Sequence, residues 1–309
     1  MSKPELDPQF KSYLSDKPNL TYAKDEDGRF RRAIIRTLEV VFGRRKIERI
    51  YHDLKKKEFD LKTFFEEAIE RSGLEIHKHG YELAQLDSSG PLILLANHPF
   101  GIVDGLVFCD LAIKQRGDFR IMINAVLCQD EKLAPYFLPV DFESTKQAMK
   151  TNIRSKQLAL QSLSNNVPLL IFPSGMVSTA GRMGFGEVRD GQWTTFAAKL
   201  VREAKATVVP VYFHGKNSRK FHIVSHLSEP LRMGLLMHEA INKFGRQINV
   251  TIGEPIRWSE KLSCLSRQEL TEYLYNSVSR LRDPKKLKIR KKPKTRKKKQ
   301  IDKEPSPYR

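Results

Sequence analysis

The chain has 309 residues, 55 of them Lys or Arg against 36 Asp or Glu, which gives a formal net charge of +19 at neutral pH. This length accommodates one large α/β domain with appendages. Three cysteines are too few for a disulfide framework, and no run of about 18 apolar residues exists to form an ordinary membrane-spanning helix. The first residues lack the apolar core of a secretion signal, so we expect a cytoplasmic protein.

Residues 1–74 are predicted to form a helical N-terminal region. Within it, apolar residues recur at helical spacing from Phe30 to Phe42, and arginines flank them. Such a helix either lies on a membrane surface or packs on the main domain, and the spacing of its apolar residues is the same in both cases.

Between Gly80 and Pro255, short apolar runs alternate with longer helical stretches. This order is typical of a mixed, mainly parallel sheet flanked by helices, so the predicted fold class is α/β, with the main domain at 75–283. The predicted strands are 92–96, 120–124, 168–172, 207–213, 221–224 and 248–252. The predicted helices are 105–115, 145–163, 193–204 and 234–244, with Asp190 or Gly191 near the cap of the third.

The sequence NHPFGIVD directly follows the apolar run 92–96, and open α/β sheets place their chemistry at the carboxyl ends of such strands. Positions six apart point about 120° away from each other on a helix, so His98 and Asp104 cannot share a helical face. Pro99 and Gly101 supply the turn between them. We therefore expect an imidazole on a loop beside a carboxylate near a helix start, which raises the basicity of the free ring nitrogen.

Two further strand ends carry unusual residues. Pro173 follows the run 169–171, and because proline cannot continue a central strand, the sheet is expected to stop there, with Ser174 and Gly175 beyond it. The second strand end contains Pro210, inside the run 207–213, and this proline requires an edge, a bulge or a strand start.

Together these blocks resemble the glycerolipid O-acyltransferase superfamily. The order and spacing match: an NH…D block, an FPxG block about 75 residues later, and a VPV block about 35 residues after that. The resemblance covers about residues 75–260 and is greatest to bacterial hemolysin-like or lyso-ornithine-lipid acyltransferases, which share NHPxGxxDG, PxFxPVD, FPxGxVS and VPVYFxGxNS. The second of these motifs is found here at 135–141 and the last at 209–218.

The resemblance implies a mechanism for the pair at the first block. His98 would act as general base on the hydroxyl of a lysolipid, whose oxygen attacks an acyl thioester carried by acyl carrier protein or coenzyme A. Asp104 would fix the tautomer of His98 and stabilise the imidazolium. No metal, no cofactor and no covalent acyl-enzyme are expected. The acceptor would be of the lyso-ornithine lipid or lysophosphatidic acid type, at the anionic inner face of the cytoplasmic membrane.

Two departures from the common superfamily pattern affect the substrate site. Five residues separate His98 from Asp104 instead of four, so the loop is expected to bulge at Gly101. Ser174 stands where the common FPEG motif has an acidic residue, which leaves room for an acceptor other than a glycerol phosphate. The predicted substrate-binding residues are Asn97, Gly101, Ser174, Gly175, Arg182 and Lys216.

Two alternatives compete with the acyltransferase hypothesis. A serine hydrolase would use Ser174 with His98 and Asp104, although this serine lacks the GxSxG elbow. A nucleic-acid-binding protein would act through the tail 284–309, where the stretch 285–299 holds eleven Lys or Arg and no acid. This tail is predicted to be disordered and to meet an anionic bilayer. Nucleic acid is not the expected partner, because aromatic residues do not interleave the charges and no binding module precedes them.

Overall fold

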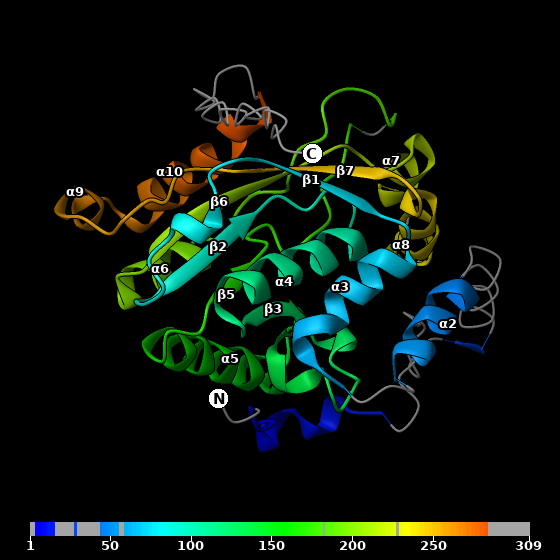
Figure 1. The fold of residues 1–309 in the computed structure, drawn as a ribbon, viewed down its shortest axis with the longest axis horizontal. Helices are drawn as coiled ribbons and strands as arrows, with labels where there is room; N and C mark the ends of the chain where they lie inside the picture. Colours follow the sequence, from blue (N-terminus) through cyan, green and yellow to red (C-terminus); the bar gives the residue numbers. More distant parts are fainter. Residues whose placement is uncertain are drawn as a thin grey trace, which may run out of the picture.

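A seven-stranded sheet in the order β1-β7-β6-β2-β5-β3-β4 forms the centre of the molecule (Figure 1). The computed structural model describes residues 4–15, 28–29, 44–55, 59–181, 183–226 and 229–283. Its strands are β1 Glu75–Gly80, β2 Leu92–Ala96, β3 Arg120–Asn124, β4 Phe137–Val140, β5 Leu169–Ile171, β6 Thr207–His214 and β7 Gln247–Ile252. Every neighbouring pair is parallel except β6 and β7, which confirms the predicted mixed, mainly parallel α/β fold.

Helices cover both faces of this sheet (Figure 1). They are α2 Arg44–Lys55, α3 Leu61–Arg71, α4 Ile102–Arg116, α5 Lys146–Ser164, α6 Phe196–Ala204, α7 Arg219–Ser225, α8 Glu229–Lys243, α9 Glu260–Cys264 and α10 Arg267–Ser279. On one face of the sheet, helices α3 and α4 share an apolar core with side chains of β2, β6 and β7. On the other face, helices α5, α6 and α10 share a second core with side chains of β2 and β5.

Strand β2 has the sequence LILLA, and all five of its residues are buried. It lies between β5 and β6 and is parallel to both, so its side chains enter the cores on both faces of the sheet. A continuous apolar run is the pattern expected of a parallel strand covered on both sides. The carboxyl end of β2 therefore has a fixed position, and the chain leaves the sheet there at Asn97.

The strand predicted at 221–224 is wrong, because this segment belongs to helix α7. The hydroxyl of Ser218 accepts a hydrogen bond from the backbone N–H of Phe221 and caps the helix. The carboxylate of Glu239, from α8, in turn accepts hydrogen bonds from the N–H and the hydroxyl of Ser218. A tertiary contact thus stabilises the helix start and overrides the β propensity of the Phe-His-Ile-Val run.

Pro210 lies at a bulge, which is one of the three places predicted for it, the others being an edge strand and the start of a strand. Val211 pairs with Ile252 on β7, whereas Val208 pairs with Ile256, so one extra residue lies on the β7 side. The N–H of Gly253 donates to the carbonyl of Pro210. The proline therefore lies in a strand with neighbours on both sides without leaving a ladder hydrogen bond unmade.

Several predictions concern parts of the chain outside the described residues. The predicted helix at 30–42 and the tail at 284–309 both lie entirely outside the described residues. The division at residue 74 stays a prediction, and α3, which precedes it, contributes Leu61, Phe65 and Ile69 to the main core. Within the described ranges, no helix has both the length and the apolar content needed to cross a membrane.

Candidate active site

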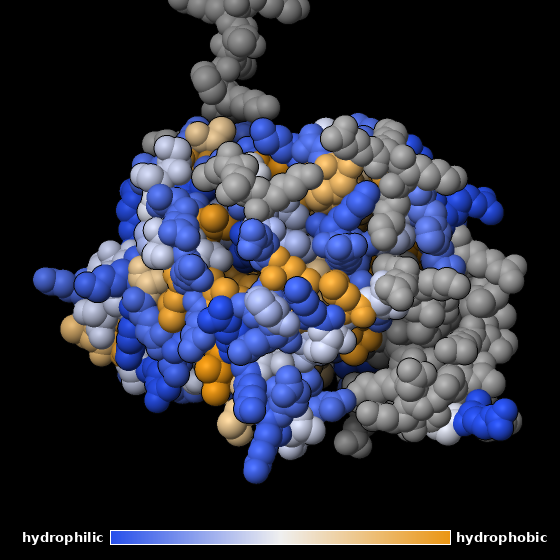
Figure 2. All heavy atoms as spheres, turned by 90° about the horizontal axis from the view of Figure 1, so that it is seen from below, coloured by the Kyte–Doolittle hydropathy of each residue, from blue (hydrophilic) through white to orange (hydrophobic). Residues whose placement is uncertain are grey.

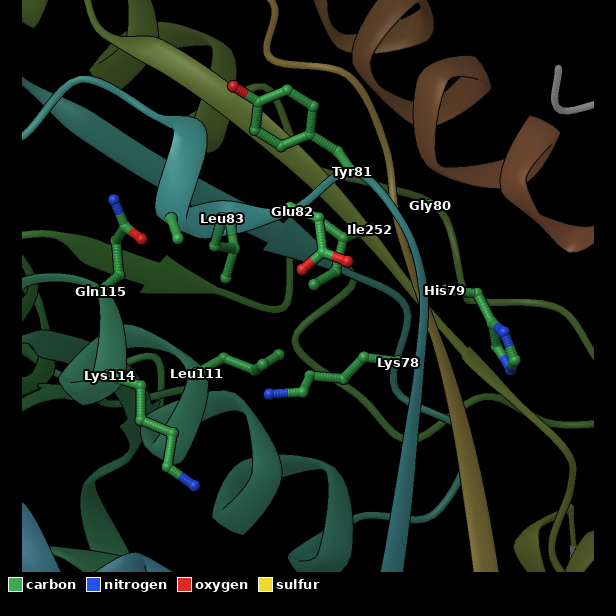
Figure 3. Close-up of a pocket in the computed structure, with 11 residues that line it drawn as sticks. Lys78, His79, Gly80, Tyr81, Glu82, Leu83, Leu111, Lys114, Gln115 and Ile252 are labelled. Atoms are coloured by element: carbon green, nitrogen blue, oxygen red, sulfur yellow. The ribbon is translucent and has the colours of Figure 1, made fainter. Parts of the chain in front are cut away.

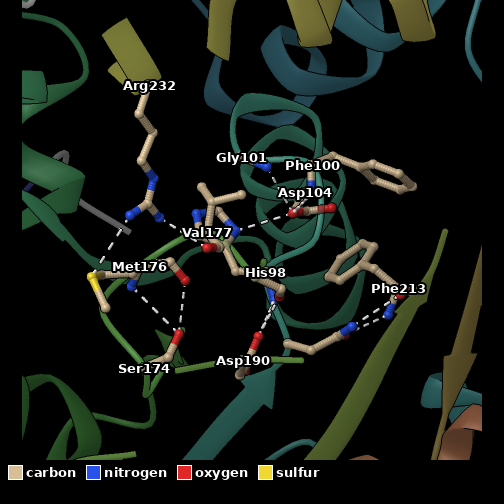
Figure 4. A network of polar contacts seen from close by, with 12 residues as sticks. His98, Phe100, Gly101, Asp104, Ser174, Met176, Val177, Asp190, Phe213 and Arg232 are labelled. Atoms are coloured by element: carbon tan, nitrogen blue, oxygen red, sulfur yellow. Dashed lines mark hydrogen bonds and ion pairs between the residues drawn. The ribbon is translucent and has the colours of Figure 1, made fainter. Parts of the chain in front are cut away.

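His98 and Asp104 lie together at the carboxyl end of β2 (Figure 4). Their Nδ1 and Oδ2 atoms are 3.1 Å apart, and the two side chains are 18% and 0% exposed. The turn that joins them depends on Gly101, whose φ of +87° a residue with a side chain rarely adopts. Helix α4 begins at Ile102, so Asp104 lies in its first turn. The predicted loop imidazole beside a carboxylate at a helix start is confirmed as geometry.

Asp104 is held by the backbone of the turn that precedes it. Its Oδ2 accepts hydrogen bonds from the N–H of Phe100 at 2.7 Å and of Gly101 at 3.0 Å. Burial raises the pKa of Asp104, and the contact with His98 and the two N–H donors oppose that rise. The carboxylate therefore has one fixed orientation, facing Nδ1 of His98 from a fully buried position, where electrostatic interactions are strong.

The backbone of His98 is fastened on both sides by residues from a distant part of the chain. Its N–H donates to Oδ1 of Asp190 at 3.2 Å, and its carbonyl accepts from the N–H of Ser178 at 2.8 Å. The hydroxyl of Ser178 and the indole N–H of Trp193 also donate to Asp190, whose pKa burial raises. The expectation that Asp190 lies near the cap of α6 is wrong, since that cap is Thr195. Asp190 organises the loop of His98 instead.

The imidazole ring of His98 also stacks on a neighbouring aromatic residue. The ring centroids of His98 and Phe172 are 3.9 Å apart and the planes are inclined by 23°. Phe172 directly follows β5, so the carboxyl ends of two adjacent strands together position the imidazole. Contacts to its ring, its N–H and its carbonyl therefore hold His98 in one position.

Asn97, predicted to bind substrate, uses its side chain to join two strand ends. Its amide nitrogen donates to the carbonyl of Phe213 at 3.0 Å, and its amide oxygen accepts from the N–H of Phe213 at 2.7 Å. Phe213 lies near the end of β6. Asn97 thus fixes the position of the residue before His98, and its amide points toward the backbone of β6.

The loop after β5 places Ser174 and Gly175 as the sequence predicted, directly beyond the sheet. The hydroxyl of Ser174 donates to the carbonyl of Met176 at 2.8 Å, and within the described residues no hydrogen bond joins it to His98. Figure 4 shows Ser174 directed toward Met176, while His98 faces Asp104. This arrangement is not that of a serine hydrolase, in which the serine must lie within hydrogen-bonding reach of the base.

The block after β6 packs directly on the block that contains His98. A Cβ on Gly215 would lie 2.4 Å from Cζ of Phe100, so only glycine permits this approach. Lys216, predicted to bind substrate, follows on an exposed part of the loop. Arg182, also predicted to do so, lies outside the described residues. The described part of the chain contains no group of three or more His, Cys, Asp or Glu that would hold a metal ion.

A pocket of about 180 Å³ lies at the other end of α4 (Figure 3). The residues that line it include Lys78, Glu82, Leu111 and Lys114. Asp104 and Lys114 are ten positions apart on α4, which corresponds to roughly 15 Å along a helix axis. This pocket is therefore separate from the site around His98.

Comparisons with known proteins identify the family of this chain. A family model described as acyltransferase matches residues 23–284, and the chain belongs to this family. It is therefore an acyltransferase, as the resemblance of its sequence motifs implied.

Two similar proteins are each named lyso-glycine lipid O-acyltransferase. The one from Phocaeicola vulgatus is 29% identical over 203 residues, which cover 63% of this chain and 69% of the relative. The one from Bacteroides thetaiotaomicron is 28% identical over 226 residues, which cover 71% and 79%. Among solved structures, the 1-acyl-sn-glycerophosphate acyltransferase PlsC from Thermotoga maritima matches with a TM-score of 0.47 at 17% identity, over 85% of this chain and 91% of that one.

Proposed function

We propose that this acyltransferase transfers a fatty acyl group from an acyl thioester to the hydroxyl of a lysolipid at a membrane surface. The observation that carries the proposal is the buried contact between His98 and Asp104 at the end of β2. The names of the two curated relatives support a lysolipid as the acceptor.

The proposed reaction runs through the imidazole. His98 takes the proton from the acceptor hydroxyl, and the oxygen attacks the thioester carbonyl to give a tetrahedral oxyanion. Asp104 stabilises the imidazolium formed in this step. The intermediate then collapses, the carbon–sulfur bond breaks, and the thiolate takes the proton from His98 as the ester is released. General-base action of this kind contributes about 10² to 10⁴ in rate.

The proposed acceptor is a lysolipid with an amino-acid head group. Ser174 replaces the acidic residue of the common motif. Arg232, from α8, reaches the same loop and donates to the carbonyl of Val177 at 2.9 Å (Figure 4). A guanidinium pairs well with a planar carboxylate, so Arg232 would contact the head group of a lyso-glycine or lyso-ornithine lipid. The Arg232→Gln variant is then expected to raise KM for that acceptor more than it lowers kcat.

Acyl transfer by the purified protein tests the proposal. Lyso-glycine lipid, lyso-ornithine lipid and lysophosphatidic acid would serve as acceptors, and acyl carrier protein and coenzyme A thioesters as donors, with products identified by mass spectrometry. We expect an O-acylated product from the wild type and about 10³-fold slower formation by His98→Ala. Equal rates in the two proteins would refute the role of His98. Release of free fatty acid as the main product would instead favour a hydrolase.

The cellular location of the reaction follows from its substrates. A lysolipid acceptor is part of a bilayer, and the proposed place of the enzyme is peripheral on the inner face of the cytoplasmic membrane. The basic tail at 284–309 would contribute to this attachment through anionic lipids. Comparing wild-type protein with a truncation at Pro284 on anionic vesicles and on duplex DNA distinguishes lipid from nucleic acid as the partner of the tail.

A further inference from the structure

The segment from Thr179 to Arg189 forms a closed hairpin that the sequence did not predict. Thr179 and Arg189 exchange two backbone hydrogen bonds, of 3.0 and 3.1 Å. Beyond them the chain presents Met183 and Phe185, which are 70% and 60% exposed. Large apolar side chains at this exposure mark an interaction surface when they occur together.

The tip of this hairpin has a defined conformation on helix α7. The guanidinium of Arg219 lies 3.5 Å from the centroid of the Phe185 ring, and Nε of Arg219 donates to the carbonyl of Met183 at 3.3 Å. Gly184 has a φ of +70°, and a Cβ on it would lie 2.7 Å from Cγ of Arg219. The exposed apolar side chains are therefore fixed in place by specific contacts.

The base of the hairpin connects directly to the catalytic histidine. Ser178 and Asp190, which immediately flank the hairpin, are the two residues that fasten the backbone of His98. Two histidines of the α7 region hold the first turn: the N–H of Ala180 donates to Nδ1 of His222, and Nε2 of His226 lies 2.8 Å from the carbonyl of Ala180. The tip thus has a fixed relation to the active site.

The charges on the hairpin suit an anionic surface. Glu187 is the only acidic residue among the described residues of the hairpin, and it is ion-paired with Arg189 and Arg282. Arg219 lies over Phe185, and the exposed Lys220 follows it. Apolar side chains surrounded by arginine and lysine are the arrangement that binds the interface of an anionic bilayer.

Two other exposed apolar residues, Met149 and Ile153, lie together on α5. They line a groove of about 610 Å³ together with Lys146, Lys156 and Lys199. Figure 2 views the molecule from below, where α5 lies in Figure 1, and shows apolar patches interrupted by hydrophilic side chains. These two residues have no hydrogen bond to the loop of His98 among the described contacts, which distinguishes them from the hairpin.

We propose that the 179–189 hairpin docks the active-site end of this enzyme on an anionic bilayer, with Met183 and Phe185 inserted among the lipid chains, in addition to the attachment through the basic tail. The inference rests on the proposed function, because the lipid acceptor must reach His98 from the bilayer. Docking through the tip places the base of the hairpin, and with it His98, next to the membrane surface. The arginines then meet the lipid head groups.

The experiment compares the full chain with a double variant, Met183→Asp with Phe185→Asp, and with Tyr273→Asp on α10 as the matched control. Tyr273 is also a large exposed side chain, at 39%. Binding to phosphatidylcholine–phosphatidylglycerol vesicles is measured at high salt, where the contribution of the basic tail is screened. Activity is measured on those vesicles and on short-chain substrates dissolved as monomers. In parallel, Phe185→Trp reports insertion by the shift of its emission on addition of vesicles.

We expect the double variant to bind vesicles at least about tenfold more weakly, to lose activity on vesicles in proportion, and to keep its activity on monomeric substrates. The control should stay within about twofold of the wild type in all three assays. The emission of Phe185→Trp should shift to the blue. Unchanged vesicle binding of the double variant, or an unshifted emission, would overturn the proposal.

Two other outcomes identify what failed. If the double variant loses rate only with acyl carrier protein as donor and binds vesicles normally, the hairpin contacts the carrier protein and the docking proposal is wrong. If vesicle binding falls as expected but the wild type transfers no acyl group to any lysolipid, docking stands and the proposed function fails.

Discussion

Helix α4 carries two buried carboxylates, Asp104 and Asp110, each beside a basic side chain, and these basic side chains differ in exposure, at 18% for His98 and 44% for Lys114. At its start, Asp104 is fully buried, accepts two backbone N–H groups and lies 3.1 Å from His98. At its end, Asp110 lies 3.0 Å from Lys114, which also pairs with Glu66 at 2.9 Å. Lys114 and Glu66 are 44% and 48% exposed, so water screens that pair.

The distances in the two pairs are almost equal, so the surroundings of each pair, and not the distance between its charged atoms, distinguish them. Exposed ion pairs contribute about 0 to 1 kcal/mol to stability, because solvent and side-chain entropy offset their attraction. The Asp104 carboxylate was desolvated when the chain folded and has a single orientation, so its interaction with a developing imidazolium needs no reorganisation. Four variants test this difference, and they are given from the largest expected effect on activity to the smallest.

The largest effect is expected for Asp104→Asn. An amide oxygen in place of Oδ2 still accepts from Phe100 and Gly101, so the turn is preserved, but the charge that stabilises the imidazolium is lost. We expect kcat to fall about 10²- to 10⁴-fold.

The stability of Asp104→Asn has a predictable dependence on pH. Burial raises the pKa of Asp104 above that of the unfolded chain, so its ionised form destabilises the folded state. That cost is absent below the unfolded pKa of about 4 and grows as the pH rises through the folded pKa. At pH 7 the variant should therefore unfold at a Tm no lower than the wild type, and this advantage should shrink in acid. A variant much less stable at pH 7 would contradict this account.

Asp190→Asn should have a smaller effect, because Asp190 acts through the backbone of His98. The amide oxygen can still accept from His98, but the amide nitrogen then faces the N–H of Trp193, and that hydrogen bond is lost. We expect kcat to fall about tenfold with little change in KM. Trp193→Phe removes the same hydrogen bond and should reproduce part of the loss. An equal rise in KM would indicate that Asp190 contacts substrate instead.

His222→Asn tests the fastening of the hairpin to α7. Burial lowers the pKa of His222, and its Nδ1 accepts from the N–H of Ala180 only when unprotonated. The stabilisation is therefore complete above the unfolded pKa of about 6.5 and is lost as the pH falls through the lower folded pKa. An asparagine oxygen accepts at any pH, so the variant should lose less Tm than the wild type between pH 7 and pH 5. If Tm of the wild type and of the variant depended on pH in the same way, protonation of His222 would not contribute to the loss of stability in acid.

Lys114→Ala is expected to have the smallest effect on activity. It should leave kcat and KM within about twofold, and lower the free energy of unfolding by about 1 to 2 kcal/mol, because the buried Asp110 loses its partner. Glu66→Ala, which removes one of its partners, is the companion control. A large loss of activity in Lys114→Ala would place the pocket at this end of α4 in the reaction and undo the comparison.

The sequence predicted best those elements that single apolar runs determine. The bounds of β2 and β3 agree with the predicted strands, because both runs are apolar enough to require burial wherever they pair. Strand β1 was missed: Glu75–Gly80 is mostly exposed at the edge of the sheet and carries two histidines and a lysine, which gives no apolar pattern. Strand β4 was missed because it is short and contains Pro139.

The candidate site divides in the same way. The contact between His98 and Asp104 is local, and glycine and proline between them indicated the turn. The contact between His98 and Asp190 joins residues 92 positions apart, and nothing in the spacing or polarity of the segment around Asp190 pointed to it. Similarly, α7 depends on Glu239 from another helix, so its local β-branched residues predicted a strand. Contacts between distant segments determine what the local pattern could not.

If His98 and Asp104 act as one unit in acyl transfer, their substitutions should not be additive, and a double-mutant cycle measures this. His98→Gln, Asp104→Asn and the double variant would be compared with the wild type in kcat/KM for the same lysolipid and thioester. We expect the double variant to be about as slow as His98→Gln alone, because Asp104 has no role without the imidazole. Losses that simply multiply would show that the two residues act independently, and would contradict this expectation.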